Sequence, residues 1–164
     1  MKIYELVKTQ VIDSSIDNVF DFFAKPENLK TITPEKLSFN IITPTPITMD
    51  KGTVIDYTIR LFGIQVHWRA LITRYDPPHE FIDEQIKGPY NFWYHTHKFK
   101  EVEGGVEISD RVNYSIPMGV FGQVLHFLWI KRDLEKIFSH RKRIIDNIFV
   151  KNCPDEDEAH ERNN

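Results

Sequence analysis

The segment FIDEQIKGPYNFWYHTHKF (residues 81–99) decides the fold, because it contains two strands joined by a short turn. FIDEQI and NFWYHTHKF are rich in aromatic and β-branched residues, and KGPY between them contains the Gly and Pro typical of turns. Successive side chains of a strand point to opposite faces of the sheet. One face of the second strand therefore carries Trp93, His95, His97 and Phe99, and the other carries Phe92, Tyr94, Thr96 and Lys98.

The same alternation continues in both directions along the chain. VIDYTIRLF (54–62) and IQVHWRALI (64–72) precede the segment, and VEISDRVNY (106–114) follows it after an EGG turn. The last of these strands places an apolar set with one carboxylate on its inner face: Val106, Ile108, Asp110, Val112 and Tyr114. Consecutive short strands with links of hairpin length predict an antiparallel meander.

Different patterns flank this meander. Residues 3–12 suit a strand, and Ser14 or Ser15 is placed to cap a helix that buries Val19, Phe22 and Phe23. A second short helix is expected to end near Thr31. From Val120 to Phe149 the apolar residues recur at helical spacing, which predicts one long continuous helix. They are Val120, Val124, Phe127, Ile130, Leu134, Ile137, Phe138, Ile145 and Ile148.

The order of these elements limits the architecture. A sheet with one continuous apolar face must cover it, and the C-terminal helix is the only large element available. We therefore predict an α+β fold in which a curved antiparallel sheet wraps around the long C-terminal helix, with two short helices after the first strand. Residues 1–149 form a single domain in this prediction, and residues 150–164 form a disordered acidic tail.

Three segments resemble a known superfamily. They are FFAKPENLKTITP (22–34), FIDEQIKGPYNFWYHTHKF (81–99) and VEISDRVNYSIPMG (106–119). With these segments the chain resembles the START/Bet v1-like (SRPBCC) superfamily, and within it the small bacterial ligand-binding and polyketide-cyclase-like proteins. The resemblance implies the helix-grip fold over roughly residues 1–149, but it does not specify a ligand, because the superfamily serves several functions.

The strand register predicts what surrounds the two histidines. Pairing Phe99 with Val106 matches apolar residues with apolar ones, and it places His95 opposite Asp110. With KGPY as a four-residue loop, Glu84 lies diagonal to His95 on the inner face; a bulge would put Asp83 there instead. The sequence thus predicts a polar patch on the inner wall: Glu84, His95, His97 and Asp110.

This patch within an apolar frame suits a small-molecule pocket, which needs a mostly apolar lining and a few hydrogen-bonding groups. We predict that the cavity between the sheet and the C-terminal helix binds a hydrophobic or aromatic molecule: a lipid, a quinone or a polyketide-like compound. The expected contacts are Tyr57, Trp68, Glu84, Trp93, His95, His97, Phe99, Asp110, Tyr114 and Phe127.

Other interpretations of the patch stay open. It could be a purely structural seam, or His95, His97 and Asp110 could serve a cyclase- or dehydratase-like enzyme in which a His–Asp pair is the general base. Two histidines with Asp110 or Glu84 could also hold a metal ion. Since no firm pairing supplies a third histidine, we expect no metal and no other cofactor. A module with a collapsed cavity that binds a protein partner is a further alternative.

Composition excludes several other classes. A net charge of −3 and a pI near 6.2 give no general attraction to nucleic acid. A single cysteine, Cys153, excludes an internal disulfide. With no secretory signal, and apolar runs far short of the roughly 20 residues of a membrane helix, a cytoplasmic protein is expected.

Additional apolar residues widen the face of the C-terminal helix: Phe121, Leu125, Leu128 and Trp129. They suggest a pocket mouth, a surface for transient membrane contact or a dimer contact. The oligomeric state is left open.

Overall fold

The computed structural model of the chain describes residues 2–151. Its strands are β1 (Tyr4–Ile12), β2 (Asn40–Ile41), β3 (Val54–Leu61), β4 (Ile64–Asp76), β5 (Glu80–Lys87), β6 (Phe92–Val102) and β7 (Gly105–Ser115). Its helices are α1 (Ile16–Phe23), α2 (Leu29–Ile32), α3 (Gly119–Leu125) and α4 (Lys131–Lys151), with short 3₁₀ turns at Pro26–Asn28 and Glu35–Leu37. A π-helical segment, η3 (His126–Ile130), joins α3 to α4.

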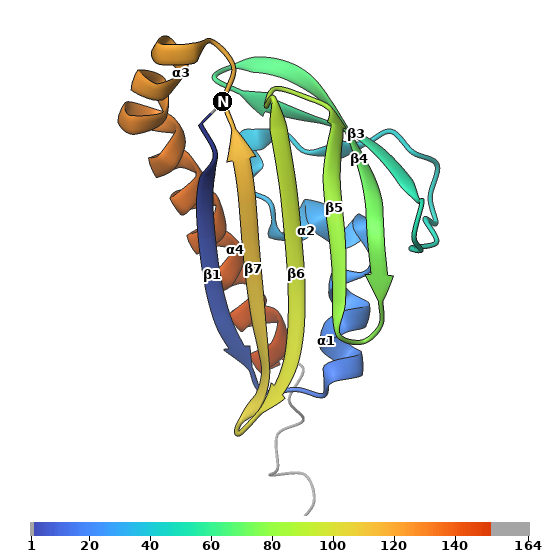
Figure 1. Cartoon of the computed structure of the whole chain (residues 1–164). Coiled ribbons are helices and arrows are strands. Elements are labelled where there is room, and N and C mark those ends of the chain that lie inside the picture. Colours follow the sequence, from blue (N-terminus) through green and yellow to red (C-terminus); the bar gives the residue numbers. More distant parts are fainter. Residues whose placement is uncertain (1, 152–164) are drawn as a thin grey trace, which may run out of the picture.

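The strands form one sheet, in which β1 pairs with β7 and the others follow as a meander. The order is β1-β7-β6-β5-β4-β3-β2, and every pairing is antiparallel. The sheet is curved, and the helices α1, α2 and α4 lie on the same side of it (Figure 1). The predicted helix-grip arrangement is confirmed.

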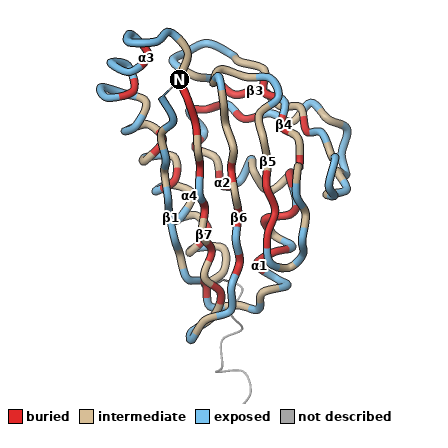
Figure 2. The backbone as a smooth tube through the Cα atoms, viewed as in Figure 1, coloured by how far each residue is buried: buried red, intermediate tan, exposed pale blue. Residues whose placement is uncertain are grey.

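Alternation along the strands produces the core. The inner residues predicted for β7 are all buried: Val106, Ile108, Asp110, Val112 and Tyr114. Buried and more exposed positions alternate along β6 and β7 in Figure 2. Because side chains of a strand point alternately to either face, the spacing of apolar residues correctly identified the inner face.

The first helix begins where it was predicted. Ser15 is the N-cap, and its hydroxyl oxygen accepts a hydrogen bond from the Asn18 N–H. Val19 and Phe23 are buried as expected, but the third buried residue is Phe20 and not Phe22. Phe20 packs edge-on against aromatic rings of β5 and β6 and anchors α1 on the sheet.

The C-terminal part is helical from residue 119 to residue 151, as predicted, but it is not one uniform α-helix. Leu134, Phe138 and Ile145 are buried, whereas Val124 and Phe127 are 52% and 79% exposed. Val124 precedes the π-helical segment η3, and Phe127 lies within it. A π turn contains more residues than an α turn, so it shifts the helical phase and the apolar positions before it leave the core-facing stripe.

Among residues 2–151, no helix has the length and hydropathy needed to cross a membrane. The tail predicted for residues 150–164 lies outside the described residues beyond Lys151, and so does Cys153.

Candidate ligand-binding site

A cavity of about 190 Å³ lies between the inner face of the sheet and α4. The segment from Pro26 to Phe39 closes one side of it, and Leu134 and Phe138 of α4 close another. The sheet contributes aromatic and aliphatic side chains from β3, β4, β5 and β6, among them Tyr57, Ile59, Trp68, Ala70, Phe81 and Trp93. The walls are therefore mainly apolar, as a small-molecule site requires.

Aromatic rings pack against one another along one wall of the cavity. Tyr57 and Trp68 stack at a centroid distance of 5.9 Å, and Trp93 meets Trp68 edge-on at 5.2 Å. The Trp68 Nε1–H group is buried and has no hydrogen-bond partner among the described residues. A buried donor without an acceptor is costly, so this indole favours a ligand that brings an acceptor oxygen.

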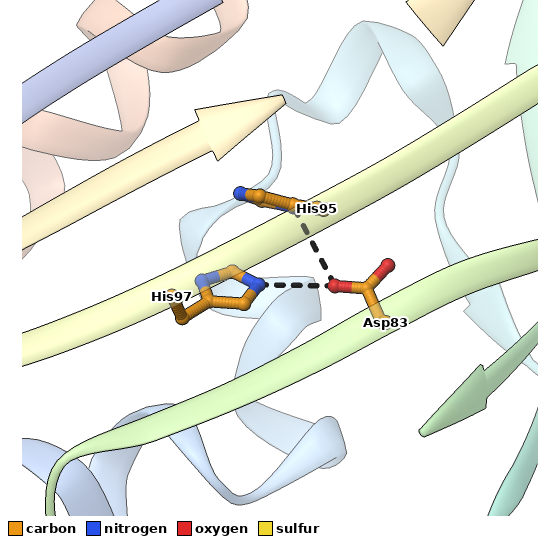
Figure 3. Close-up of side chains that lie close together, drawn as sticks. All are labelled: Asp83, His95 and His97. Carbon is orange, nitrogen blue, oxygen red and sulfur yellow. Dashed lines mark hydrogen bonds and ion pairs between the residues drawn. The ribbon is translucent and has the colours of Figure 1, made fainter. Parts of the chain in front are cut away.

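The polar end of the cavity is built from two neighbouring strands. Asp83 on β5 is directly opposite His95 on β6, and His97 follows on the same face of β6. Asp83 Oδ2 lies 3.0 Å from His97 Nε2 and 3.5 Å from His95 Nδ1. Figure 3 shows the carboxylate of Asp83 facing both imidazole rings. All three side chains line the cavity.

Asp110 on β7 lies on the other side of the same two rings. Its Oδ1 is 2.7 Å from His97 Nδ1 and 3.3 Å from His95 Nε2. The guanidinium of Arg141 on α4 is 3.8 Å from the same oxygen. Each imidazole is thus held between a carboxylate that borders the cavity and a carboxylate behind it.

Burial and these charges shift the pKa values in opposite directions. Burial tends to raise the pKa of Asp110, but the charge of Arg141 and the two imidazoles outweigh it and hold the pKa well below its ordinary value. Burial also opposes protonation of His97, yet the contacts with Asp110 and Asp83 raise the pKa of His97. For His95, burial and the nearby charge of His97 lower the pKa. At neutral pH, His95 is therefore the neutral member of the pair.

The predicted register between β6 and β7 is wrong by two residues. Phe99 pairs with Ile108 instead of Val106, so Asp110 is opposite His97 instead of His95. The prediction assumed a wide turn, whereas Val102 already pairs with Gly105 and only two residues form the turn. Gly104 has a positive φ of 86°, which permits this tight turn. A shift of two leaves every side chain on its predicted face.

The placement of Glu84 is also wrong, by one residue, which changes the face. Glu84 pairs with Tyr94, and Asp83 takes the place on the cavity wall. The pairing of β5 with β6 ends at Glu84 and Tyr94, and beyond it the Gln85 side chain bonds the backbone of Tyr90. Its Nε2 donates to the Tyr90 carbonyl at 2.7 Å, and its Oε1 accepts from the Tyr90 N–H at 3.3 Å.

The remaining predicted residues fall into three groups. Tyr57, Trp68, Trp93, His95 and His97 line the cavity. Asp110, Phe99 and Tyr114 are buried beside it but do not border it. Phe127 is wrong as a cavity residue, because the phase shift at η3 leaves it 79% exposed.

Phe138 and Arg141 are among the residues of the site that were not predicted as contacts from the sequence. Both line the cavity. The spacing of Leu134, Phe138, Arg141 and Ile145 places Arg141 on the apolar stripe of α4. This position could have identified Arg141 as a residue of the site, because a charged side chain on a core-facing stripe needs a partner of opposite charge.

No family model matches the sequence, and no curated protein matches it. Solved structures do share the fold. The protein TTHA0849 from Thermus thermophilus has a TM-score of 0.68 at 16% identity, over 87% of this chain and 97% of that one. Ginseng major latex-like protein 151 from Panax ginseng has a TM-score of 0.66 at 12% identity, over 90% and 98%.

A third similar structure is the di-domain ARO/CYC StfQ from the steffimycin biosynthetic pathway. It has a TM-score of 0.66 at 12% identity and covers 91% of this chain but 52% of that chain. Such likenesses at low identity establish the fold, and they confirm the predicted helix-grip architecture.

Proposed function

We propose that the protein binds a hydrophobic or aromatic small molecule, such as a lipid, a quinone or a polyketide-like compound, between the sheet and α4. The observation that carries this proposal is the cavity of about 190 Å³ with apolar walls and one polar end. A dry apolar cavity of roughly 150 Å³ is enough to bind a benzene-sized molecule. The cavity argues against the alternative of a collapsed interior.

Two polar features supply orientation. The Trp68 indole N–H offers a donor without a partner among the described residues, and His95, whose pKa is lowered, lies at the polar end of the cavity. A ligand with an aromatic or aliphatic body and at least one oxygen acceptor matches this arrangement.

Filling the cavity tests the proposal. Ala70→Leu adds side-chain volume to the cavity wall, and we expect it to weaken binding of the apolar probe 8-anilinonaphthalene-1-sulfonate by about tenfold, roughly 1.4 kcal/mol. Probe fluorescence and native mass spectrometry of the purified protein measure binding and any co-purified ligand. Val7→Leu, on an exposed position of β1, is the control and should bind normally. An empty protein that binds no probe would contradict the proposal.

A cyclase- or dehydratase-like activity is the second candidate. The specific observation in its favour is that His97 faces the cavity while Asp110 holds its other ring nitrogen at 2.7 Å, an arrangement suited to a general base. The name of StfQ refers to such chemistry in that protein. Native mass spectrometry separates a dehydratase from a carrier, because dehydration lowers the mass of the bound molecule by one water, whereas a carrier leaves its ligand unchanged.

An exposed apolar surface suggests where a ligand is exchanged. We define the apolar lip as the exposed residues Met118, Val120, Phe121, Val124, Leu125, Phe127, Leu128 and Trp129. The tip of the β3–β4 hairpin lies at the same end of the molecule (Figure 1), and its Phe62 and Ile64 are 71% and 69% exposed. Leu61, next to this tip, lines the cavity.

The charges beside the apolar lip favour an anionic membrane surface as its partner. Residues 131–143 contain five exposed Lys or Arg side chains, namely Lys131, Arg132, Lys136, Lys142 and Arg143. The acidic residues of this stretch, Asp133 and Glu135, are less exposed. Exposed aromatic rings next to basic side chains are typical of surfaces that bind the headgroup region of anionic bilayers.

Vesicle sedimentation tests membrane binding. We expect the protein to bind vesicles of phosphatidylcholine with phosphatidylglycerol, less at high salt, and we expect Phe127→Glu/Trp129→Glu to reduce binding about tenfold or more. Val7→Glu, on β1, is the matched control. A protein that is monomeric in the analytical ultracentrifuge and binds vesicles through the apolar lip supports the proposal. Dimerisation that the double variant abolishes, without vesicle binding, would show that a second copy covers the lip.

A further inference from the structure

At the polar end of the cavity, three side chains that can bind a metal ion lie close together. Asp83 Oδ2, His95 Nδ1 and His97 Nε2 all lie within 4.8 Å of one another, and the two distances from Asp83 are 3.0 and 3.5 Å. In a tetrahedral site with bonds of about 2.1 Å, ligand atoms are about 3.4 Å apart. Only small movements of the side chains would place all three atoms at bonding distance from one ion.

The second ring nitrogen of each histidine has its own partner. His97 Nδ1 and His95 Nε2 both face Asp110 Oδ1, at 2.7 and 3.3 Å. An imidazole whose N–H is held by a carboxylate directs the lone pair of its other nitrogen to a metal ion, and this arrangement recurs in metal sites. One carboxylate oxygen thus lies behind both rings, and Nδ1 of His95 and Nε2 of His97 are the ring nitrogens on the side of Asp83.

The local charge also favours a cation. Asp83 and Asp110 carry two negative charges, and Arg141 supplies one positive charge 3.8 Å from Asp110. Since His95 and His97 are neutral when they ligate a metal, one negative charge is left to be balanced in a buried environment. A divalent ion next to Asp83 would neutralise this charge and leave one positive charge on the site, whereas a proton on His97, the competing cation, would balance it.

We propose that Asp83, His95 and His97 form a binding site for one divalent transition-metal ion, with Asp110 as the carboxylate that orients both imidazoles. Two nitrogens and one carboxylate oxygen favour Zn²⁺, Co²⁺ or Fe²⁺ over Mg²⁺ and Ca²⁺, which prefer oxygen ligands. All three side chains border the cavity, so the remaining coordination positions face the space that the small molecule would fill. An oxygen of that molecule, or a water, would complete the coordination.

Metal binding is measured on the full-length chain after treatment with EDTA. We expect one equivalent of Zn²⁺ by isothermal titration and elemental analysis, and a visible absorption spectrum of a protein-bound Co²⁺ ion with nitrogen and oxygen ligands. Asp83→Asn and His97→Gln should weaken Zn²⁺ binding by about 100-fold or more, and Asp110→Asn, which leaves the ligands in place, by about 10- to 100-fold. Circular dichroism shows whether each variant is folded.

The chain offers a matched control for these variants. His67 Nε2 lies 2.7 Å from Asp56 Oδ1 on β3, a second His–Asp pair that is not part of the cavity. His67→Gln should leave Zn²⁺ binding and the Co²⁺ spectrum unchanged, and so should Cys153→Ser. Binding that survives both Asp83→Asn and His97→Gln, or no binding by the folded wild-type protein, would overturn the proposal. Binding of the apolar probe by the metal-free protein is measured separately, so the two proposals can fail independently.

Discussion

At His97, two carboxylates from neighbouring strands oppose the effect of burial on one imidazole. Asp83 of β5 and Asp110 of β7 contact its two ring nitrogens, and Arg141 of α4 lies 3.8 Å from Asp110 Oδ1. The pKa of His97 lies above the ordinary value of 6.5 because the two carboxylates outweigh burial. The stabilisation from its protonation is therefore fully present below about pH 6.5 and disappears as the pH rises through the raised pKa. Asp110 behaves oppositely, since its low pKa keeps its contribution until the solution becomes strongly acidic.

The raised pKa of His97 predicts that the effect of His97→Gln on stability depends on pH. In metal-free protein, His97→Gln should reduce the free energy of unfolding more at pH 5.5 than at pH 8, because only the protonated imidazole contributes the additional stabilisation. Urea denaturation at both values measures it. His67→Gln, at the other His–Asp pair, gives the comparison for a half-exposed imidazole. A cost of His97→Gln that does not change with pH would show that the pKa of His97 is the same in the folded and the unfolded state.

At the scale of elements, the two turns that flank β6 decide which side chains meet. The tight turn at Glu103 and Gly104 sets His97 opposite Asp110, and the loop around Gln85 sets Asp83 opposite His95. Gly105, directly after the first turn, has a φ of 128°, and a Cβ there would lie 2.0 Å from the Ile12 carbonyl oxygen. The end of β1 therefore packs against a backbone that tolerates only glycine.

Two alanine substitutions separate the effects at this turn. Gly104 also has a positive φ, but a Cβ there would meet nothing within 4 Å. We expect Gly104→Ala to cost about 1–2 kcal/mol from backbone strain alone. Gly105→Ala adds the clash with Ile12 and should cost at least about 2 kcal/mol, as overpacked sites do. Equal costs in chemical denaturation would mean that β1 can move away from the turn.

At the scale of the whole molecule, the core is divided into three clusters, and the cavity lies among them. One surrounds Phe20 beneath α1, another surrounds Trp68, and the third joins Val112 and Tyr114 to α4. On the inner face of the sheet, large aromatic residues of β3, β4 and β6 pack against one another and form one wall of the cavity. The apolar lip lies at the end of the molecule where α3 and the hairpin of β3 and β4 are found.

The sequence by itself determined the order of the elements, the face of each strand and the presence of a C-terminal helix. These properties follow from local alternation and helical spacing, and a register shift of two residues does not change them. They correctly placed His95 and His97 on the inner wall.

Only the tertiary structure decided which groups meet there. The pairing of His97 with Asp110 depends on a turn that is two residues long, and the exchange of Glu84 for Asp83 depends on the Gln85 side chain in a loop. The exposure of Phe127 follows from the phase shift at η3, and Arg141 reaches Asp110 only because α4 packs across β7. Such contacts join residues distant in the sequence, and hydrophobic periodicity has no information about the length of a turn or the phase of a helix after a π segment.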